Sequence, residues 1–153
     1  LSGGRTFQAD EYKERNMEND KALQGNEKIE EAIRGLQNEP TQEMLAHALT
    51  VVRRRMKEDG HLIVAVDPAG AMDSLQIQTI QTADGKRWFA AFTGFEEQMK
   101  GSNAVMSAFT AEIEKLFQMT LQTEEIEGLI LNPWDCTMML SKSLIHIVLG
   151  ENR

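Results

Sequence analysis

The sequence predicts an α+β fold, in which an antiparallel or mixed sheet of about four strands packs with helices. Three observations lead to this prediction. Apolar residues recur at every third or fourth position before Gly60, as on the buried side of a helix. From residue 61 to 92 they form a short run and then occupy alternate positions, which is typical of strands. Helical spacing returns beyond Thr93, and the predicted order is α-α-β-β-β-α-α-β-α.

Two helices are expected in the first part of the domain. The first extends from about residue 21 to 37 and is modestly amphipathic, although Gly25 and Gly35 weaken it. The second begins after Thr41, whose hydroxyl is suited to cap the free N–H groups of a first turn. One apolar stripe is expected along this second helix, formed by Leu45, Leu49, Val52 and Met56.

Three strands are expected next. Residues 61–66 are apolar and rich in β-branched side chains, which predicts a buried strand. Residues 75–79 alternate apolar and polar side chains, so one face of this strand is buried. The Asp84–Gly85 pair tolerates the positive φ angles of a tight hairpin, whose second strand is predicted at residues 88–92.

Two further helices are expected after the hairpin. Thr93 and Glu96 have the spacing of a capping box, in which a hydroxyl and a carboxylate each bind a free backbone N–H. This pair predicts a short helix that ends near Lys100. The apolar spacing of residues 103–121 predicts a longer helix.

One strand and one helix complete the predicted fold. Residues 126–131 contain a strand that Pro133 stops. The last helix begins near Ser141 and ends at Gly150.

Length, charge and cysteine content narrow the classes of protein. We expect a polar, poorly ordered lead-in over residues 1–20 and a single domain over residues 21–153, because domains commonly contain about 100–200 residues. The net charge of −8 argues against binding to nucleic acid, which proteins recognise largely through neutralised phosphates. Cys136 is the single cysteine and has no internal partner, which favours the cytoplasm. No apolar run approaches the roughly 18 residues of a membrane span.

The sequence contains no recognisable catalytic or metal-binding motif. A Walker loop, a dinucleotide glycine fingerprint, a zinc-protease helix and a nucleophile elbow are all absent. His47, His61 and His146 are far apart, and Cys136 has no ligand of the required kind nearby. A pairing of Cys136 with one of these histidines is conceivable, but free cysteine is usually a small buried hydrophobe. We therefore expect a protein that is not an enzyme and has no cofactor or metal.

Four phrases in the sequence together suggest a family. They are Arg-Arg-Arg-Met at 53–56, Gly-His-Leu-Ile-Val-Ala-Val at 60–66, Asp-Gly-Lys-Arg-Trp-Phe-Ala-Ala-Phe-Thr at 84–93 and Gly-Leu-Ile-Leu-Asn-Pro-Trp at 128–134. Their order resembles the N-terminal domain of the SseB-like family, named for enhanced serine sensitivity protein B. The resemblance covers residues 45–149. It implies an α+β cytoplasmic domain of unknown function and supplies no catalytic residue.

The turn after residue 131 is the first candidate binding site. In a structural interpretation, Pro133 ends the strand, Asn132 bonds its own backbone and Trp134 covers a core edge. In a functional interpretation, Trp134 stays partly exposed as an anchor, with Asn132 and Asp135 beside it. An adaptable methionine surface, formed by Met99, Met138 and Met139, is a related hypothesis.

The basic cluster of Arg53, Arg54, Arg55 and Lys57 is the second candidate. Its simplest interpretation is a solvated surface whose positive charge complements the end of a helix. Alternatively, arginine from this cluster holds an anionic metabolite or an amino acid, and Arg54 is the candidate binding residue. Successive helical residues point about 100° apart, so at most two could serve one pocket.

The sequence thus supports two hypotheses of function. The preferred one is a non-catalytic binding domain that contacts a protein partner or associates with itself. The alternative is a site that binds a small molecule, either as a sensor or as an enzyme.

Overall fold

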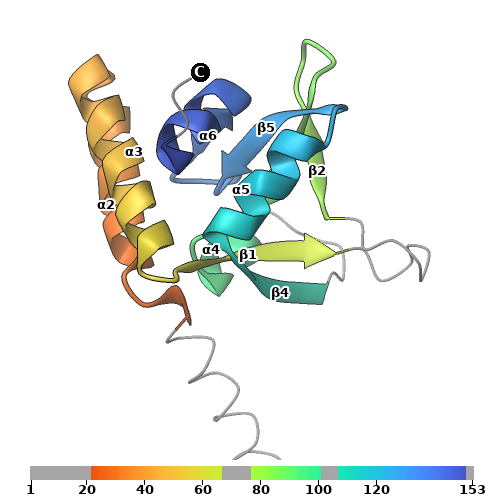
Figure 1. Ribbon diagram of the computed structural model, residues 1–153, viewed down its shortest axis with the longest axis horizontal. Coiled ribbons are helices and arrows are strands. Elements are labelled where there is room, and N and C mark those ends of the chain that lie inside the picture. The colour runs from red at the N-terminus through yellow and green to blue at the C-terminus, as the bar shows by residue number, and fades with distance from the viewer. Residues whose placement is uncertain (1–21, 67–76, 101–106, 151–153) are drawn as a thin grey trace, which may run out of the picture.

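The computed structural model describes residues 22–66, 77–100 and 107–150, and the expected lead-in over residues 1–20 lies outside them (Figure 1). The described elements, in chain order, are α2 (Asn26–Asn38), α3 (Gln42–Lys57), β1 (His61–Val66), β2 (Thr79–Gln81), β3 (Arg87–Ala91), α4 (Phe95–Met99), β4 (Ser107–Glu112), α5 (Ile113–Gln122), β5 (Ile126–Leu131), β6 (Met138–Ser141) and α6 (Lys142–Leu149). The predicted α+β class is confirmed.

The strands form a mixed four-stranded sheet and a separate two-stranded ladder. The larger sheet has the order β2-β3-β5-β6, and its central pair, β3 and β5, is parallel. The other neighbours in this sheet are antiparallel. The ladder joins β1 to β4 in antiparallel fashion, with Ile63 opposite Thr110. Isolated bridges from Ile63 to Phe92 and from Val66 to Ile77 connect the ladder to the larger sheet.

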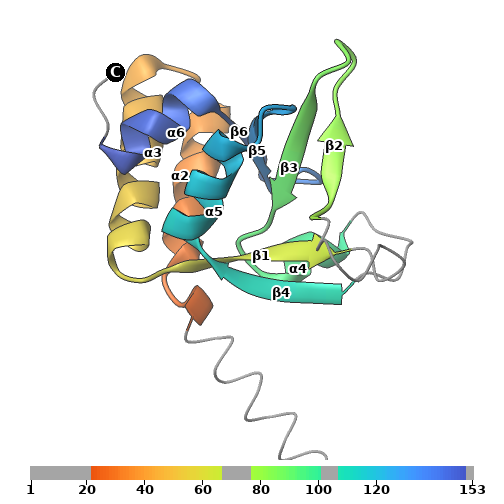
Figure 2. The same ribbon diagram turned by 45° about the vertical axis from the view of Figure 1, so that its right-hand side comes forward.

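The helices cover the sheet in layers (Figure 2). Helices α5 and α6 contact β5, while α3 packs on α6 and α2 lies beside α3. The short helix α4 contacts β1. Most buried apolar residues join one core between these layers, and Ile63, Ala65, Ala90 and Phe92 form a smaller second cluster. In the predicted stripe of α3, Leu49 and Val52 are buried, and Leu45 and Met56 pack at the core margin.

The predicted hairpin is present, with a turn of three residues. The N–H of Gly85 donates to the carbonyl of Thr82 at 2.9 Å, and the N–H of Thr82 donates to the carbonyl of Lys86 at 2.9 Å. Gly85 has a φ angle of 85°, which glycine adopts without steric cost. The first strand of the hairpin is β2, which begins at Thr79, later than predicted. Ile77 instead bridges to β1, and residues 75 and 76 lie outside the described part of the chain.

The long helix predicted over residues 103–121 is wrong in its first half. Residues 107–112 form β4, and helix α5 starts only at Ile113. Residues 103–106 lie outside the part of the chain that the structure describes. The apolar spacing fits either structure. Pairing with β1 decides the outcome, because the backbone groups of a buried strand need partners along both edges. The same requirement explains β6, a strand that the sequence did not predict and that pairs with β5.

The helix ends give a mixed result. The Thr41 cap is confirmed, since its Oγ1 accepts from the N–H of Met44 at 3.1 Å. The last helix begins after Ser141 and ends at Gly150, as predicted. Helix α2 starts at Asn26, later than expected, because Gly25 takes a left-handed conformation with a φ angle of 97°. The capping box is wrong: α4 is present, but its N-cap is Gly94, with no side-chain bond.

No helix within the described ranges is both long enough and apolar enough to cross a membrane.

Candidate binding site

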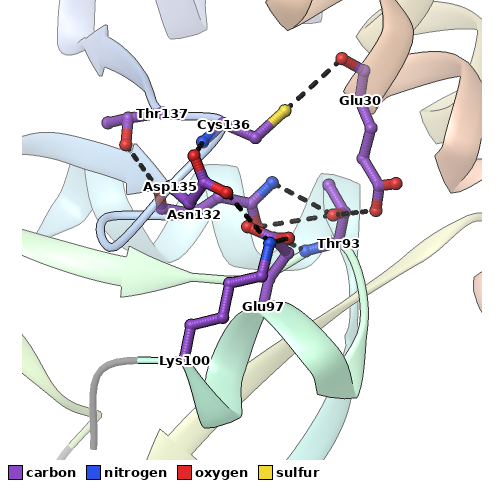
Figure 3. A network of polar contacts seen from close by, with 8 residues as sticks. All are labelled: Glu30, Thr93, Glu97, Lys100, Asn132, Asp135, Cys136 and Thr137. Atoms are coloured by element: carbon purple, nitrogen blue, oxygen red, sulfur yellow. Dashed lines mark hydrogen bonds and ion pairs between the residues drawn. The ribbon is translucent and has the colours of Figure 1, made fainter.

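The turn between β5 and β6 is built on Asn132, which is completely buried and has a φ angle of 51°. Its Oδ1 accepts from the N–H of Thr93 at 2.9 Å, and its Nδ2 donates to Thr93 Oγ1 at 3.1 Å (Figure 3). Its own N–H donates to the carbonyl of Ala91 at 2.8 Å. The predicted bond from the Asn132 side chain to its own backbone is therefore replaced by bonds to Thr93. With no exposed surface, Asn132 shapes the site from beneath.

Two further bonds attach this turn region to α2. The Thr93 hydroxyl donates to Glu30 Oε2 at 2.6 Å and accepts from Asn132 Nδ2, so it is directed to α2 and the turn and does not cap α4. The thiol of Cys136 donates to the carbonyl of Glu30 at 3.4 Å. Residues from α2, the end of β3 and the turn thus meet at one point, although more than sixty positions separate Glu30 from Thr93 in the chain.

Trp134 and Asp135 project from the fixed turn. Trp134 is 37% exposed, and the side chain of Asp135 is 66% exposed. Asp135 Oδ2 lies 3.1 Å from the ammonium group of Lys100, just beyond α4. This hydrogen bond is the main reason that the pKa of Asp135 falls below its ordinary value of 3.8. Lys100 also pairs with Glu97 Oε2, so it connects the turn to α4.

A groove of about 560 Å³ lies between α2 and α4, and we call it the α2–α4 groove. Its charged lining residues are Glu27, Glu30, Arg34, Glu96, Glu97 and Lys100. Leu23 and Phe95 supply apolar surface in the same groove. Four carboxylates therefore face two cations. The groove adjoins the turn through the Lys100–Asp135 ion pair.

Among the residues of this groove that the sequence did not single out, Glu97 is the one that is buried. Glutamate is usually exposed, and the first turn of a helix is a common place for it. The Glu97 side chain is instead only 6% exposed, and its Oε1 has no hydrogen-bond partner among the described residues. Its position in the first turn of α4 carries no local signal of burial. Its burial is therefore a result of tertiary packing.

Two of the four residues of the basic cluster on α3, Arg53 and Arg55, prove structural. Arg53 donates from Nε to the carbonyl of Val148 at 2.8 Å and from Nη2 to that of Ile147 at 2.6 Å, at the end of α6. Arg55 is only 7% exposed, so its interpretation as solvated surface is wrong. Arg54 is exposed and lines a separate hollow of about 330 Å³ with Lys28 and His47. The structure thus places Arg54 away from the lining of the α2–α4 groove.

The structure exposes two of the three methionines that were expected to form a contact surface. Met138 is 4% exposed and belongs to the core, whereas Met99 is 73% and Met139 is 44% exposed. Met99 ends α4, next to the Lys100 that lines the groove. Met139 lies on β6, opposite Ile130 in the sheet.

Cys136 is poorly suited to act as a nucleophile. It is 3% exposed, and burial raises the pKa of its thiol. His47, His61 and His146 lie on three different elements, α3, β1 and α6. Among the described residues, no three His, Cys, Asp or Glu side chains gather closely enough to hold a metal ion.

The comparison with protein families gives one match. A model described as the SseB protein N-terminal domain matches residues 29–146, which include every strand that the structure describes. The match begins earlier than the resemblance we noted from residue 45, so it takes in most of α2. No curated protein and no solved structure matches the chain. Since the family model spans most of the sequence, the chain belongs to the SseB family and has the fold of its N-terminal domain.

Proposed function

We propose that this protein is a non-catalytic cytoplasmic domain that binds a protein partner, or a second copy of itself. Its contact surface comprises the α2–α4 groove and the turn that carries Trp134 and Asp135. The observation that carries this proposal is the turn itself. The buried Asn132 fixes the base of the turn, while the side chains of Trp134 and Asp135 reach solvent.

A rigid base favours binding through exposed side chains. Tryptophan is enriched among the residues that contribute most to protein interfaces, because it buries a large area with few rotatable bonds. A turn held in one conformation also loses little entropy when a partner binds. Bonds from Asn132 and Cys136 to neighbouring elements hold this turn on both sides of Trp134.

The charge of the surface adds a preference for partner type. The chain has a net charge of −8, and the α2–α4 groove has more carboxylates than cations. An acidic surface speeds encounters with basic partners and disfavours acidic ones. We therefore expect a partner with a basic contact region.

The side chains around the turn support a non-catalytic role. The Thr93 hydroxyl is buried and already engaged by Glu30 and Asn132. The buried thiol of Cys136 stays protonated, because desolvation raises its pKa. Neither hydroxyl nor thiol contacts a histidine that could act as a base in the part of the chain that the structure describes.

The anionic-ligand alternative retains one of its three arginines. Arg53 and Arg55 donate to internal acceptors, which leaves the exposed Arg54 as a binding residue. A single exposed guanidinium group provides little selectivity for a metabolite. The alternative is therefore the weaker of the two.

Site-specific photocrosslinking tests the proposal. A photoreactive phenylalanine analogue replaces Trp134 or, in a second variant, Met99. In a third variant it replaces Ile147 on α6 as the matched control, since its exposure of 54% lies between those of Trp134 and Met99. We expect a discrete protein adduct from positions 134 and 99 and none from 147. Sedimentation velocity over a range of concentrations identifies self-association, which Trp134→Ala should weaken.

The proposal fails under two results. One is a strictly monomeric protein that forms no adduct from positions 134 and 99. The other is an adduct pattern in which position 147 reacts as efficiently as the two groove-side positions, because the contact would then not be specific to this surface.

A further inference from the structure

The α2–α4 groove contains more negative charge than its own cations balance. Glu27 and Glu96 are exposed, and Glu30 and Glu97 lie deeper. Of the two cations in the groove, Lys100 is shared between Glu97 and Asp135. The groove therefore retains unmatched carboxylates, although a group of acidic side chains alone does not define a site.

The second observation is the unpartnered oxygen of Glu97. One oxygen of this carboxylate accepts from Lys100, and the other, Oε1, is buried and accepts from no donor within the described ranges. A buried carboxylate oxygen without a donor is costly, because it has lost water and gained nothing in return. His61 Nδ1 and Trp88 Nε1 also have no partner in the described part of the chain, but neither residue lines this groove. Glu97, which lines this groove, thus supplies a buried acceptor that a donor from outside the chain can reach after a side-chain rotation.

From this arrangement we infer that the α2–α4 groove receives a cationic side chain, arginine or lysine, from a protein partner. The donor group of that side chain binds Glu97 through its free oxygen, and the exposed carboxylates of Glu27 and Glu96 attract it at the entrance. This inference rests on the proposed function and defines the chemistry that the partner presents.

The apolar part of the groove favours a protein side chain over a free cation. Leu23 and Phe95 line the same groove and are partly buried. Arginine and lysine bury their hydrocarbon stems on apolar surface while their charged ends reach a polar group. A basic side chain whose hydrocarbon stem packs on Leu23 and Phe95 can place its charged end at Glu97. The nearby Trp134 turn then contacts residues that flank the basic one.

Access to Glu97 requires a small rearrangement. Oε1 is shielded from water in the unbound protein, and the side chain of Lys100 is 39% exposed above the same carboxylate. Rotations of interface side chains accompany many protein associations without movement of the backbone. An incoming arginine can also share the carboxylate with Lys100, because it binds the opposite oxygen.

A titration followed by NMR tests this inference on the full chain labelled with ¹⁵N. The probes are blocked tripeptides, Gly-Arg-Gly and Gly-Lys-Gly, and the neutral isostere is the same peptide with citrulline. Spermidine is the small-molecule arm. We expect saturable amide shifts in α4 and around Glu27 and Glu30 with at least one cationic peptide, and none with citrulline. The two cationic peptides distinguish a guanidinium from an ammonium ligand.

Two charge-neutralising variants give matched comparisons. Glu97→Gln should weaken binding of the cationic peptide at least about tenfold, as expected for one hydrogen bond to a charged group. Glu124→Gln removes the same charge from an exposed position between α5 and β5, and should change the affinity by less than about twofold. The citrulline comparison uses the unaltered protein, so it remains decisive if Glu97→Gln fails to fold.

Several outcomes would overturn the inference. They are the absence of saturable shifts with both cationic peptides, equal shifts with citrulline, and equal affinity in Glu97→Gln and the unaltered chain. If spermidine shifts the amide signals and neither peptide does, the ligand of the groove is a free polyamine and not a protein side chain. Crosslinks from position 134 without peptide binding would reject this inference alone. Peptide binding without any crosslink or self-association would instead reject the proposed protein partner.

Discussion

Asn132 and Thr93 form a reciprocal pair of hydrogen bonds that joins the ends of β3 and β5. The carboxamide of Asn132 accepts from the Thr93 N–H at 2.9 Å and donates to the Thr93 hydroxyl at 3.1 Å. Both residues are buried, so neither can replace these bonds with water. The pair connects the parallel strands of the sheet to the turn that carries Trp134.

Asn132→Ala should therefore destabilise the fold by about 2–4 kcal/mol, because it leaves the Thr93 N–H without its acceptor and places alanine at a positive φ angle. Urea unfolding followed by circular dichroism measures this change. Asn38→Ala, at the exposed end of α2, is the control and should stay within about 0.5 kcal/mol. Equal unfolding midpoints for the two variants would contradict the assigned role of Asn132.

Arg55 and Arg54 are adjacent in sequence and should differ sharply in their contribution to stability. The buried Arg55 donates to Asn26 Oδ1 at 3.0 Å, and Asn26 in turn donates to the carbonyl groups of His61 and Thr93. Arg55→Ala leaves a buried acceptor unpaired and should cost about 2–3 kcal/mol. The exposed Arg54→Ala should change the free energy of unfolding by less than about 0.5 kcal/mol. Thermal and urea unfolding of both variants provide the comparison. A larger loss in Arg54→Ala would refute it.

Gly128 lies where β5 and β6 approach too closely for any side chain. A Cβ atom at this position would be 2.1 Å from the carbonyl oxygen of Leu140. Gly128→Ala should therefore force the strands apart and destabilise the protein by about 2–3 kcal/mol. Gly94→Ala is the matched substitution, since a Cβ there meets no atom of the described residues within 4 Å. Urea unfolding should show a near-native midpoint for Gly94→Ala alone, and similar losses in both variants would argue against the packing explanation.

The ion pair between Asp135 and Lys100 should be visible in the titration of Asp135. Its hydrogen bond to Lys100 lowers the pKa of Asp135 in the folded protein below the ordinary value of 3.8. The resulting stabilisation is present above the unfolded pKa and is lost as the pH falls through the lower folded pKa. Carboxyl ¹³C shifts measured against pH should give a midpoint below 3.8, which moves upward in Lys100→Met. Lys115→Met removes an exposed lysine that pairs with Glu112, and should leave the Asp135 midpoint unchanged.

Local sequence chemistry predicted the features that depend on a few neighbouring residues. The Thr41 cap, the Asp84–Gly85 hairpin turn and the helix end at Gly150 each depend on conformational preferences or bonds within one turn of chain. The turn at Asn132 was also found as a candidate, because an Asn-Pro pair at the end of an apolar strand interrupts regular structure. Its buried partner, Thr93, lies 39 positions away and carried no such signal.

Errors in the prediction occurred where two segments compete or cooperate over long distances. The apolar spacing of residues 107–112 fits a helix or a strand, and the free edge of β1 selects the strand. Thr93 has the right spacing to cap α4, but its hydroxyl accepts from Asn132 Nδ2 at 3.1 Å and donates to Glu30 at 2.6 Å, and Gly94 takes the N-cap position. In both cases a distant partner outweighed a local preference.

The sequence by itself determined the α+β class, the family and the absence of familiar catalytic motifs, because periodicity, turn residues and ordered motifs are properties of short segments. The tertiary structure alone decided that Arg55 and Glu97 are buried, that Asn132 supports the turn from within, and that α2 and α4 enclose an acidic groove. Burial and electrostatic pairing depend on which surfaces meet when the chain closes. Such contacts join residues tens of positions apart, and no local pattern specifies them.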